Sequence, residues 1–329
     1  MQGAAPQARI SLPAYIDSSM LSSWRACRRK FYHAHLLSLH PTGKSIHLVA
    51  GGAFAAGMEA ARRVVFQNLG NHRPANNGVL EAAYKAFAGE WGDFQAAEGS
   101  PKSFENTFGA LEKYLLQYPP ETDEIQPLRR PDGSPAVEYT FAIPLDEAPP
   151  HPETGDPFNF VGRFDLLGTI NDLPCIVDEK TTSSIGFQWD SQWDLRGQFM
   201  GYLWACQQQG YQINTAVIRG IGILKRDIKF ATSIKQYPQH LIERWYRQLI
   251  FDVQDIVSAY DMHTKDLRVG LDYSDQHFRY NFADSCNAYG GCAYAPLCLA
   301  KEPEAFEVNY VKHRWDPLAK QPVKDIENA

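Results

Sequence analysis

The sequence predicts an α/β protein with a mixed β-sheet, on the evidence of three features. Its middle part alternates between helix-like and strand-like stretches in the order helix, three strands, helix, strand. The apolar run Cys175-Ile176-Val177 has the character of a buried strand. Hydrophobic residues make up 44% of the 329 residues and aromatic residues 12%, which indicates a globular protein with a large core and excludes a disordered chain.

The individual elements follow from hydrophobic periodicity and from Gly, Pro, Asn and Asp at the breaks. In order, the expected elements are helices at 18–39, 48–69, 79–97 and 102–118, strands at 136–145, 158–170 and 173–181, a helix at 188–210, strands at 212–224 and 228–235, a helix at 238–264 and a short strand at 277–282. Ser18 or Ser19 is the expected N-cap of the first helix. Asn171-Asp172 is expected to form the turn of a β-hairpin.

Charged residues lie where the two strands of this hairpin come together. Asp165 is on one strand, and Asp178, Glu179 and Lys180 follow the apolar run of the other. Acid-x-Lys on a strand more often marks a solvated sheet edge, but here a buried strand leads into the charges, and unpaired buried charges are costly. Carboxylates are ligands that Mg²⁺ and Mn²⁺ prefer, and a nearby lysine can orient an attacking water. The pattern therefore favours metal-assisted hydrolysis of phosphodiesters.

The helix expected after the hairpin adds two polar side chains. Gln198 and Tyr202 are four residues apart, so both project from one face of that helix. Gly162 precedes Asp165 by three residues and allows a close approach of backbone or ligand.

Four cysteines are candidates for one metal centre. Cys286, Cys292 and Cys298 have the spacing Cys-x5-Cys-x5-Cys, and Cys27 in the first helix is the candidate for a fourth ligand. Clustered thiols in a cytosolic protein are more often metal ligands than disulfides. Zinc and a [4Fe–4S] cluster both accept four thiolates, and the wide spacing favours the cluster over zinc. Such a centre would join the two ends of the chain in a structural role.

The other two cysteines, Cys175 and Cys206, lie in apolar segments and are expected to be core residues.

The basic residues are concentrated in the first helix, although the net charge of the chain is −6. A local patch is enough to contact phosphates, so a negative total does not exclude nucleic-acid binding. The candidate phosphate-binding residues are Arg25, Arg28, Arg29 and Lys30. Trp24, Phe31 and Tyr32 are candidates to stack on unpaired bases, although core packing is the more common role of such aromatics.

Taken together, these motifs resemble the PD-(D/E)XK nuclease superfamily, in particular its RecB-like branch with an iron–sulfur cluster, which includes CRISPR-associated exonucleases and phage nucleases. The resemblance rests on the segments Gly162–Asp165 and Ile176–Thr181, on Gln198 with Tyr202, and on one early and three late cysteines. It implies a restriction-endonuclease-like αβββαβ core in a single domain over 1–329. It further implies a helical insertion at 70–135 and cluster-binding segments at 18–35 and 280–300 that staple the termini.

The resemblance also implies roles for individual residues. Asp165 and Asp178 would be metal ligands, and Lys180 would position the water and balance negative charge. Glu179 occupies the variable place of the motif, where its side chain would be an additional acid or a bystander. Gln198 and Tyr202 would contact DNA phosphate or steady the lysine.

Two features depart from the family pattern. No histidine stands in the second helix where relatives carry a metal ligand, so Glu59 or Glu138 is the candidate third ligand. The three late cysteines are also spaced more widely than in the usual family pattern, which begins with a closer pair of cysteines. This difference bears on the type of cluster.

The function implied is that of a Mg²⁺- or Mn²⁺-dependent deoxyribonuclease, an exonuclease acting on single-stranded DNA or duplex ends in phage DNA processing, recombination or repair. A helicase or recombination protein is a possible partner. The alternative is a catalytically degenerate, cluster-stabilised DNA-binding or scaffold subunit. No apolar run is long enough to cross a membrane and no secretory signal is recognisable, so the expected location is the cytoplasm.

Overall fold

The computed structural model describes residues 10–67, 76–130, 132–282, 284–287, 291–314, 316 and 318. These residues form two compact units. The sheet unit contains Lys44–Phe141 and Arg163–Glu243. The terminal unit lies within Met1–Gly43, Ala142–Gly162 and Arg244–Val323. The single domain expected over residues 1–329, with its helical insertion, stays a prediction.

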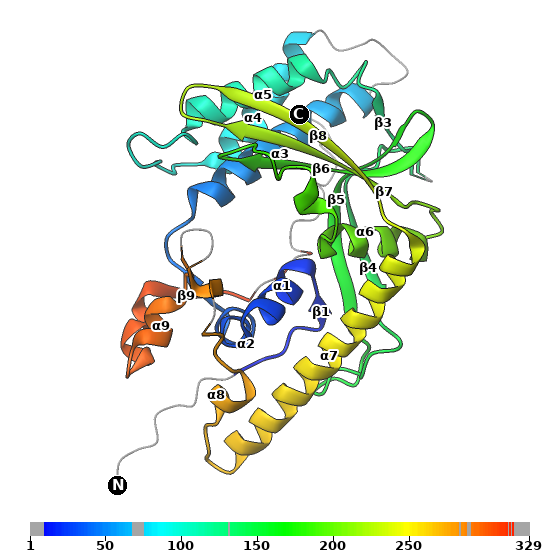
Figure 1. Ribbon diagram of the computed structural model, residues 1–329. Coiled ribbons are helices and arrows are strands. Elements are labelled where there is room, and N and C mark those ends of the chain that lie inside the picture. Colours follow the sequence, from blue (N-terminus) through cyan, green and yellow to red (C-terminus); the bar gives the residue numbers. More distant parts are fainter. Residues whose placement is uncertain are drawn as a thin grey trace. The chain divides into compact units, whose positions relative to one another are not determined.

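The sheet unit is built on a mixed β-sheet, as the sequence predicts (Figure 1). Its strands are β3 (Ile125–Pro127), β4 (Val137–Pro144), β5 (Asn159–Ile170), β6 (Leu173–Thr182), β7 (Thr215–Ile223) and β8 (Ile228–Gln236). The order β5-β6-β7-β8 has β6 antiparallel to β5 and parallel to β7, and β8 antiparallel to β7. Both β3 and β4 pair with β5. The architecture is consistent with a restriction-endonuclease-like fold.

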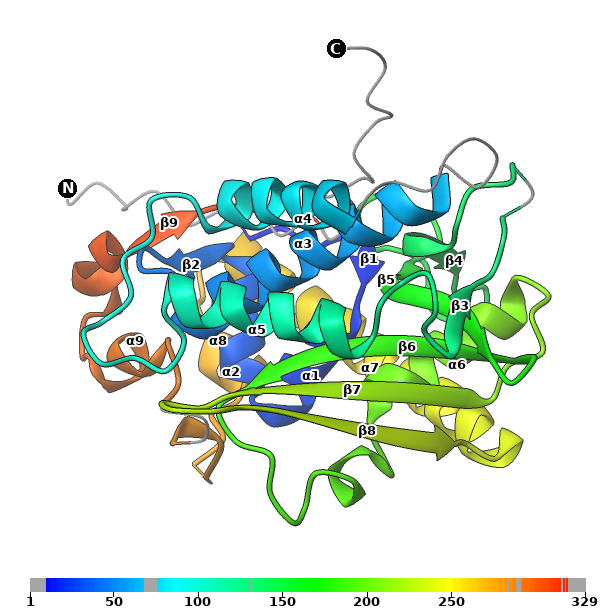
Figure 2. The ribbon, with the colours of Figure 1, turned by 90° about the horizontal axis from the view of Figure 1, so that it is seen from above.

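Three helices cover one face of this sheet, as Figure 2 shows. They are α3 (Ile46–Gln67), α4 (Asn76–Trp91) and α5 (Phe104–Gln117), and their apolar sides form a core with Ile221 and Ile223 of β7. A Cβ at Gly57 of α3 would lie 2.4 Å from Leu111 of α5, so the two helices pack closer there than any other residue allows. Alternate strand residues face the opposite side, where Gly220 of β7 accommodates the ring of Trp189.

Local chemistry explains where several elements begin and end. The hairpin turn lies between β5 and β6, where Asn171 and Asp172 have φ of 49° and 62°, the left-handed conformation that this turn type requires. Ser103 caps α5, accepting a hydrogen bond from the Asn106 N–H at 3.1 Å.

The terminal unit begins with α1 (Ser18–Ala26), α2 (Arg28–Phe31) and a π-helical turn (Tyr32–Leu36). The first helix is capped by Asp17, whose carboxylate accepts from the Met20 N–H at 2.7 Å, so the prediction of a serine cap was wrong. The helix expected over 18–39 is interrupted because Cys27 is extended, with φ −164° and ψ 113°.

Further short elements complete this unit. β1 (Tyr15–Ile16) pairs in parallel with the start of β5, and β2 (Leu39–Pro41) pairs with β9 (Tyr310–Lys312). The long α7 (Gln239–Arg268) contributes its residues from Arg244 onward, followed by α8 (Ser274–His277) and α9 (Ala295–Leu299).

Aromatic packing forms the interior of the terminal unit and corrects one expectation. Trp24, Phe31 and Tyr32 are all buried, and Trp24 and Tyr32 pack on Phe278 with ring centroids 6.3 and 5.0 Å away. Because no face of these rings is open, they cannot stack on unpaired bases. The strand expected at 277–282 is also wrong, since α8 ends at His277 and the next five residues are irregular.

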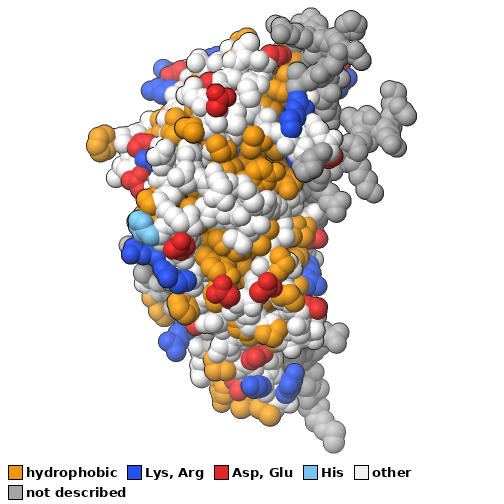
Figure 3. All heavy atoms as spheres, turned by 90° about the vertical axis from the view of Figure 1, so that its right-hand side faces the viewer, with side chains coloured by type: hydrophobic (Ala, Val, Ile, Leu, Met, Phe, Trp, Pro, Cys, Tyr) orange, Lys and Arg blue, Asp and Glu red, His pale blue; other side chains and the backbone are white. Residues whose placement is uncertain are grey.

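Within the described residues, no helix combines the length and apolarity needed to cross a bilayer. On the face drawn in Figure 3, acidic, basic and hydrophobic side chains are interspersed, and its described residues form no continuous basic surface.

Candidate active site

The candidate site lies in the sheet unit, where the β5–β6 pairing ends. Regular pairing runs from Ile170 with Leu173 to Leu166 with Val177. At the next position a hydrogen bond to a side chain replaces the backbone pairing: the Glu179 N–H donates to Asp165 Oδ2 at 3.0 Å. The Asp165 carboxylate is thus fixed beside the charged end of β6.

Two further predicted residues contact Asp178, and a third contacts one of them. The Lys180 Nζ lies 2.6 Å from Asp178 Oδ2, and Gln198 Nε2 donates to Asp178 Oδ1 at 3.3 Å. Gln198 Nε2 also lies 3.2 Å from the Tyr202 hydroxyl, one turn further along α6 (Gly197–Gln208). The ring of Tyr202 packs edge-on against Phe164 at 5.1 Å. The structure therefore brings Asp165, Asp178, Lys180, Gln198 and Tyr202 together.

The two aspartates are in an environment that disfavours their charged forms. Burial and the neighbouring charges of Asp178 and Glu138 raise the pKa of Asp165 well above its usual range. Burial also raises the pKa of Asp178, although Lys180 acts in the opposite direction. Asp178 Oδ2 is buried, and its partner is the Lys180 ammonium group at 2.6 Å. Carboxylates held in this way are suited to bind a cation.

Lys180 stays cationic in this setting. Burial by itself lowers its pKa, but the charges of Asp178 and Asp165 outweigh burial and raise it. A lysine with a raised pKa cannot remove a proton at neutral pH, so it can orient water or compensate negative charge.

Glu179 points to the other face of β6, as the two-residue period of a strand requires. Its carboxylate is buried against α3 and α5, where it accepts two hydrogen bonds from Arg62 and one from Tyr114 at 3.0 Å. Although burial raises the pKa of Glu179, the charge of Arg62 outweighs it and lowers the pKa. The structure does not bring this carboxylate together with that of Asp178. Glu179 reaches the site through its backbone N–H to Asp165.

Glu138 and Glu59, the two candidates for a third metal ligand, differ in their surroundings. Glu138, on β4, is 4% exposed, and burial raises its pKa to about 7 despite an ion pair with Arg163 at 2.7 Å. Its φ of 47° is a strained value for a glutamate, a feature that clusters at functional sites. Glu59 instead pairs with Arg63 on its own helix, at 2.8 Å. The charge of Glu138 raises the pKa of Asp165, whereas the charge of Glu59 raises that of Glu138.

Arg196 is a site residue that the sequence reasoning missed. It is the N-cap residue of α6 and is exposed, and its charge acts on both Asp178 and Lys180. It makes no ion pair with any acid in the described part of the chain. Its position two residues before Gln198 is the only signal that the sequence offers.

Lys102 lies next to the end of β6, and it is buried without an acidic partner among the described residues. Its Nζ lies 3.3 Å from both the carbonyl oxygen and the hydroxyl of Thr181. Burial lowers the pKa of Lys102 to about 8. Its ammonium group is therefore destabilised by folding at neutral pH.

This lysine gives the protein a pH-dependent stability. Between about pH 8 and pH 10.4 the unfolded chain holds a proton on Lys102 that the folded chain has lost, so folding becomes more favourable as pH rises. The free energy of unfolding of wild type, minus that of Lys102→Met, is expected to increase by about 2 kcal/mol across this window. Urea titrations of both proteins at several pH values measure it, and a flat difference would contradict the assignment.

The four candidate ligand cysteines all belong to the terminal unit. The Cys292 N–H donates to the Cys286 carbonyl at 2.8 Å, and Asn281 links Cys286 to the residue before Cys27. Burial raises the pKa of Cys298 to about 11, and negative charge on Cys27, Cys292 and Cys286 adds to this rise. The four thiols are thus within electrostatic reach of one another.

The other predicted cysteines and basic residues are placed as follows. Cys175 and Cys206 are fully buried core residues. Of the basic side chains, Arg25 is 2.6 Å from Asp252 and Arg28 is 2.8 Å from Asp255, so α7 compensates both. Arg29 is buried, and Lys30 is exposed.

Neither the acids at the end of β6 nor the four cysteines are arranged as a complete metal site. Among the residues that the structure describes, no group of three or more His, Cys, Asp or Glu side chains has the geometry to hold a metal ion.

Comparison with known proteins bears on the family. The model of a family described as "PD-(D/E)XK nuclease superfamily" matches residues 18–299. A solved structure titled "Crystal structure of SSO0001" is 11% identical, covers 64% of this chain and 87% of its own, and has a TM-score of 0.27, too low to support a statement about fold. No curated protein matches. Because the family match covers most of the chain and includes the Asp165, Asp178 and Lys180 site, the chain belongs to the PD-(D/E)XK nuclease superfamily.

Proposed function

We propose that this nuclease hydrolyses DNA phosphodiesters with Mg²⁺ or Mn²⁺ bound by Asp165, Asp178 and Glu138. Superfamily membership implies nuclease activity. The observation that carries the metal proposal is the group of acids whose charged forms are disfavoured: burial raises the pKa of Asp165, Asp178 and Glu138, and the charges of Asp178 and Glu138 raise that of Asp165 further. Carboxylate oxygens of this kind fit a hard divalent cation. When bound, the ion supplies a polarised water and charge compensation at the phosphate.

The chain's own residues account for the rest of the reaction. Gln198 holds the Asp178 carboxylate in place through its hydrogen bond. Lys180 stays protonated, so its role is to orient the nucleophilic water and to balance the charge that develops on the phosphate. Arg196, exposed beside both, attracts the scissile phosphate. Glu179 positions Asp165 through its backbone N–H.

The finer biological role rests on the resemblance to the RecB-like branch. In this role the protein digests single-stranded DNA or duplex ends as an exonuclease, in phage DNA processing, recombination or repair, together with a helicase or recombination protein.

A cleavage assay tests this function. Purified protein is incubated with end-labelled single-stranded and duplex DNA in Mg²⁺ or Mn²⁺, with EDTA as the control. Metal-dependent release of nucleotides is the expected result. A protein that binds DNA and leaves it intact under every metal condition would instead be the degenerate scaffold subunit.

A matched pair of variants tests the third ligand. Glu138→Gln is expected to lower the cleavage rate about 100-fold, because a metal-binding charge is lost at the site. Glu59→Gln, on the neighbouring helix, is expected to change the rate less than about twofold. Initial rates over a Mn²⁺ titration measure both. Equal losses in the two variants would contradict the choice of Glu138.

We also propose that Cys27, Cys286, Cys292 and Cys298 hold a [4Fe–4S] cluster in a structural role. The support is that they share one compact unit and that the charges of the other three raise the pKa of Cys298. Cys286 is exposed and held by one weak bond, 3.6 Å from the Asn281 carbonyl, so its side chain can turn toward the others.

Anaerobic purification tests the cluster. Wild type is expected to be brown and to contain iron and acid-labile sulfide. Cys292→Ser is expected to lose both, whereas Cys206→Ser, which removes a buried core thiol, retains them. A colourless wild-type protein containing zinc would contradict the cluster.

A further inference from the structure

A column of stacked groups runs from the interior of the terminal unit to its surface. The Arg29 guanidinium lies 4.9 Å from the ring centroid of Tyr32 and 5.2 Å from that of Tyr280. The Tyr280 ring in turn stacks on Phe282, with centroids 5.6 Å apart and planes at 9°. Tyr32 and Arg29 are buried, whereas Phe282 is 94% exposed. The last ring of an ordered column therefore faces solvent.

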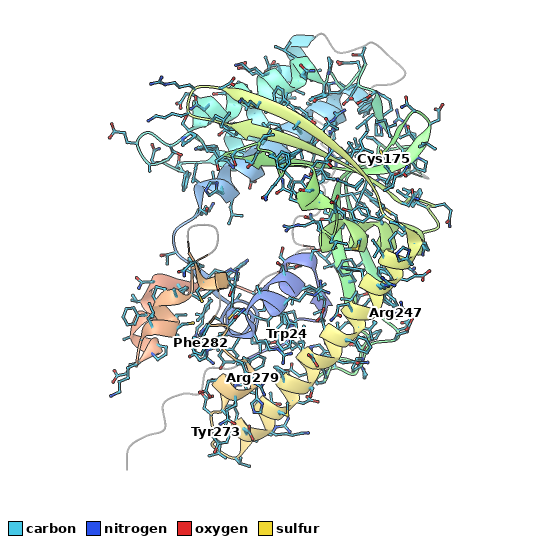
Figure 4. All side chains as sticks on the ribbon, in the orientation of Figure 1. Trp24, Cys175, Arg247, Tyr273, Arg279 and Phe282 are labelled. Atoms are coloured by element: carbon cyan, nitrogen blue, oxygen red, sulfur yellow. The ribbon has the colours of Figure 1, made fainter. Side chains whose placement is uncertain are left out.

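The segment that carries the exposed ring is fixed to α1 and α2. The Arg29 N–H donates to the Arg279 carbonyl at 3.2 Å, and the Asn281 side chain donates to the Ala26 carbonyl at 2.5 Å. Arg29 itself is held by a hydrogen bond to Ser274 at 3.0 Å. Figure 4 shows Arg279 and Phe282 on this segment. The segment is thus ordered before a ligand binds, which lowers the entropic cost of binding.

Basic side chains lie within the column and next to it in the chain. Arg29 is 8% exposed, yet no carboxylate of the described residues pairs with it, and its Nε makes no hydrogen bond. Arg279 and Lys30 are exposed, and neither forms an ion pair with a described acid. An exposed flat ring near an exposed arginine matches the two parts of a nucleotide, a base with a π-face and a phosphate.

We propose that Tyr280 and Phe282, with Arg29 and Arg279, form a stacking site for an unpaired base of single-stranded DNA. The site deepens the proposed function, because it selects substrates that carry unpaired nucleotides. A base within a duplex cannot reach the Phe282 ring, since both of its faces are already stacked on neighbouring base pairs.

Binding measurements without catalysis test the site. Fluorescence anisotropy of a labelled oligo(dT) and of a blunt hairpin duplex is recorded in EDTA with wild type and variants. Phe282→Ala is expected to weaken single-strand binding about 5- to 100-fold and to leave duplex binding unchanged. Phe282→Trp keeps the π-face and is expected to bind like wild type. Phe282→Leu keeps an apolar side chain without that face and should resemble the alanine variant.

The matched control is Phe251→Ala, which removes another exposed aromatic ring of the same unit, on α7, outside the column. It is expected to bind single strands like wild type. An unchanged affinity of Phe282→Ala for oligo(dT) would overturn the proposal and leave the ring to a protein partner. Equal losses on single strands and duplexes would also overturn it.

Crosslinking of the unaltered protein gives a second readout that does not depend on variant folding. Ultraviolet irradiation with a 5-iodouracil-containing single strand is expected to label the peptide that holds Tyr280 and Phe282. Labelling confined to other peptides would contradict the site. Because binding and crosslinking need no hydrolysis, they can fail while DNA cleavage succeeds, and the reverse.

Discussion

Asp165→Asn is expected to reduce DNA cleavage by about a thousandfold or more, and Lys180→Met by a similar factor. The asparagine removes one of the three carboxylates of the proposed metal site. The methionine removes the cation that lies 2.6 Å from Asp178. Both replacements preserve side-chain size, so the loss reports charge rather than packing. Initial rates on end-labelled DNA at saturating Mn²⁺ measure the effect.

Folding and DNA binding are the controls for these two variants. Removal of a carboxylate with a raised pKa relieves repulsion among Asp165, Asp178 and Glu138, so Asp165→Asn should be at least as stable as wild type. Anisotropy in EDTA should show DNA binding within about twofold of wild type. Near-wild-type cleavage in both variants, free of contaminating nuclease, would reject the site.

Arg62→Met is expected to destabilise the fold by about 3–5 kcal/mol. Arg62 and Glu179 are both almost fully buried, and Tyr114 is the only other described side chain that donates to this carboxylate. Loss of the guanidinium would therefore leave a buried carboxylate without its ion-pair partner. The free energy of unfolding from urea titration measures the cost.

The double variant Arg62→Met/Glu179→Gln separates charge from packing. Because the amide is neutral, it is expected to recover more than half of the lost stability. Lys85→Met is the matched control, since its partner Glu81 is exposed on α4 and exposed ion pairs contribute little to stability. A loss in Arg62→Met no larger than that in Lys85→Met would show that the buried pair does not anchor β6.

The sequence predicted the sheet and the residues that lie together at the end of β6, because both depend on local rules. The Asn171-Asp172 turn fixes the hairpin, and the apolar run before Asp178 fixes the buried strand that delivers the acids. The two-residue period of that strand also decides that Glu179 leaves the face of Asp178 and Lys180, a consequence available from the sequence alone.

The remaining features depend on contacts between distant parts of the chain. The burial of Trp24 and Phe31 results from packing that no local pattern specifies. The left-handed backbone of Glu138 carries no sequence signal, because glutamate is not a residue that favours it. The sequence around Phe282 predicted a strand and gave no sign that this ring is exposed. Its exposure results from hydrogen bonds that fix the segment to Ala26 and Arg29.

Binding of Mn²⁺ in the absence of DNA tests most directly whether the acids at the end of β6 converge on a divalent ion. Electron paramagnetic resonance of free Mn²⁺ is recorded during titration of wild type and of Asp178→Asn. Wild type is expected to bind Mn²⁺, and Asp178→Asn is expected to bind it at least about tenfold more weakly, because a charged ligand is lost. Equal Mn²⁺ affinity in the two proteins would contradict the metal site and the hydrolysis derived from it.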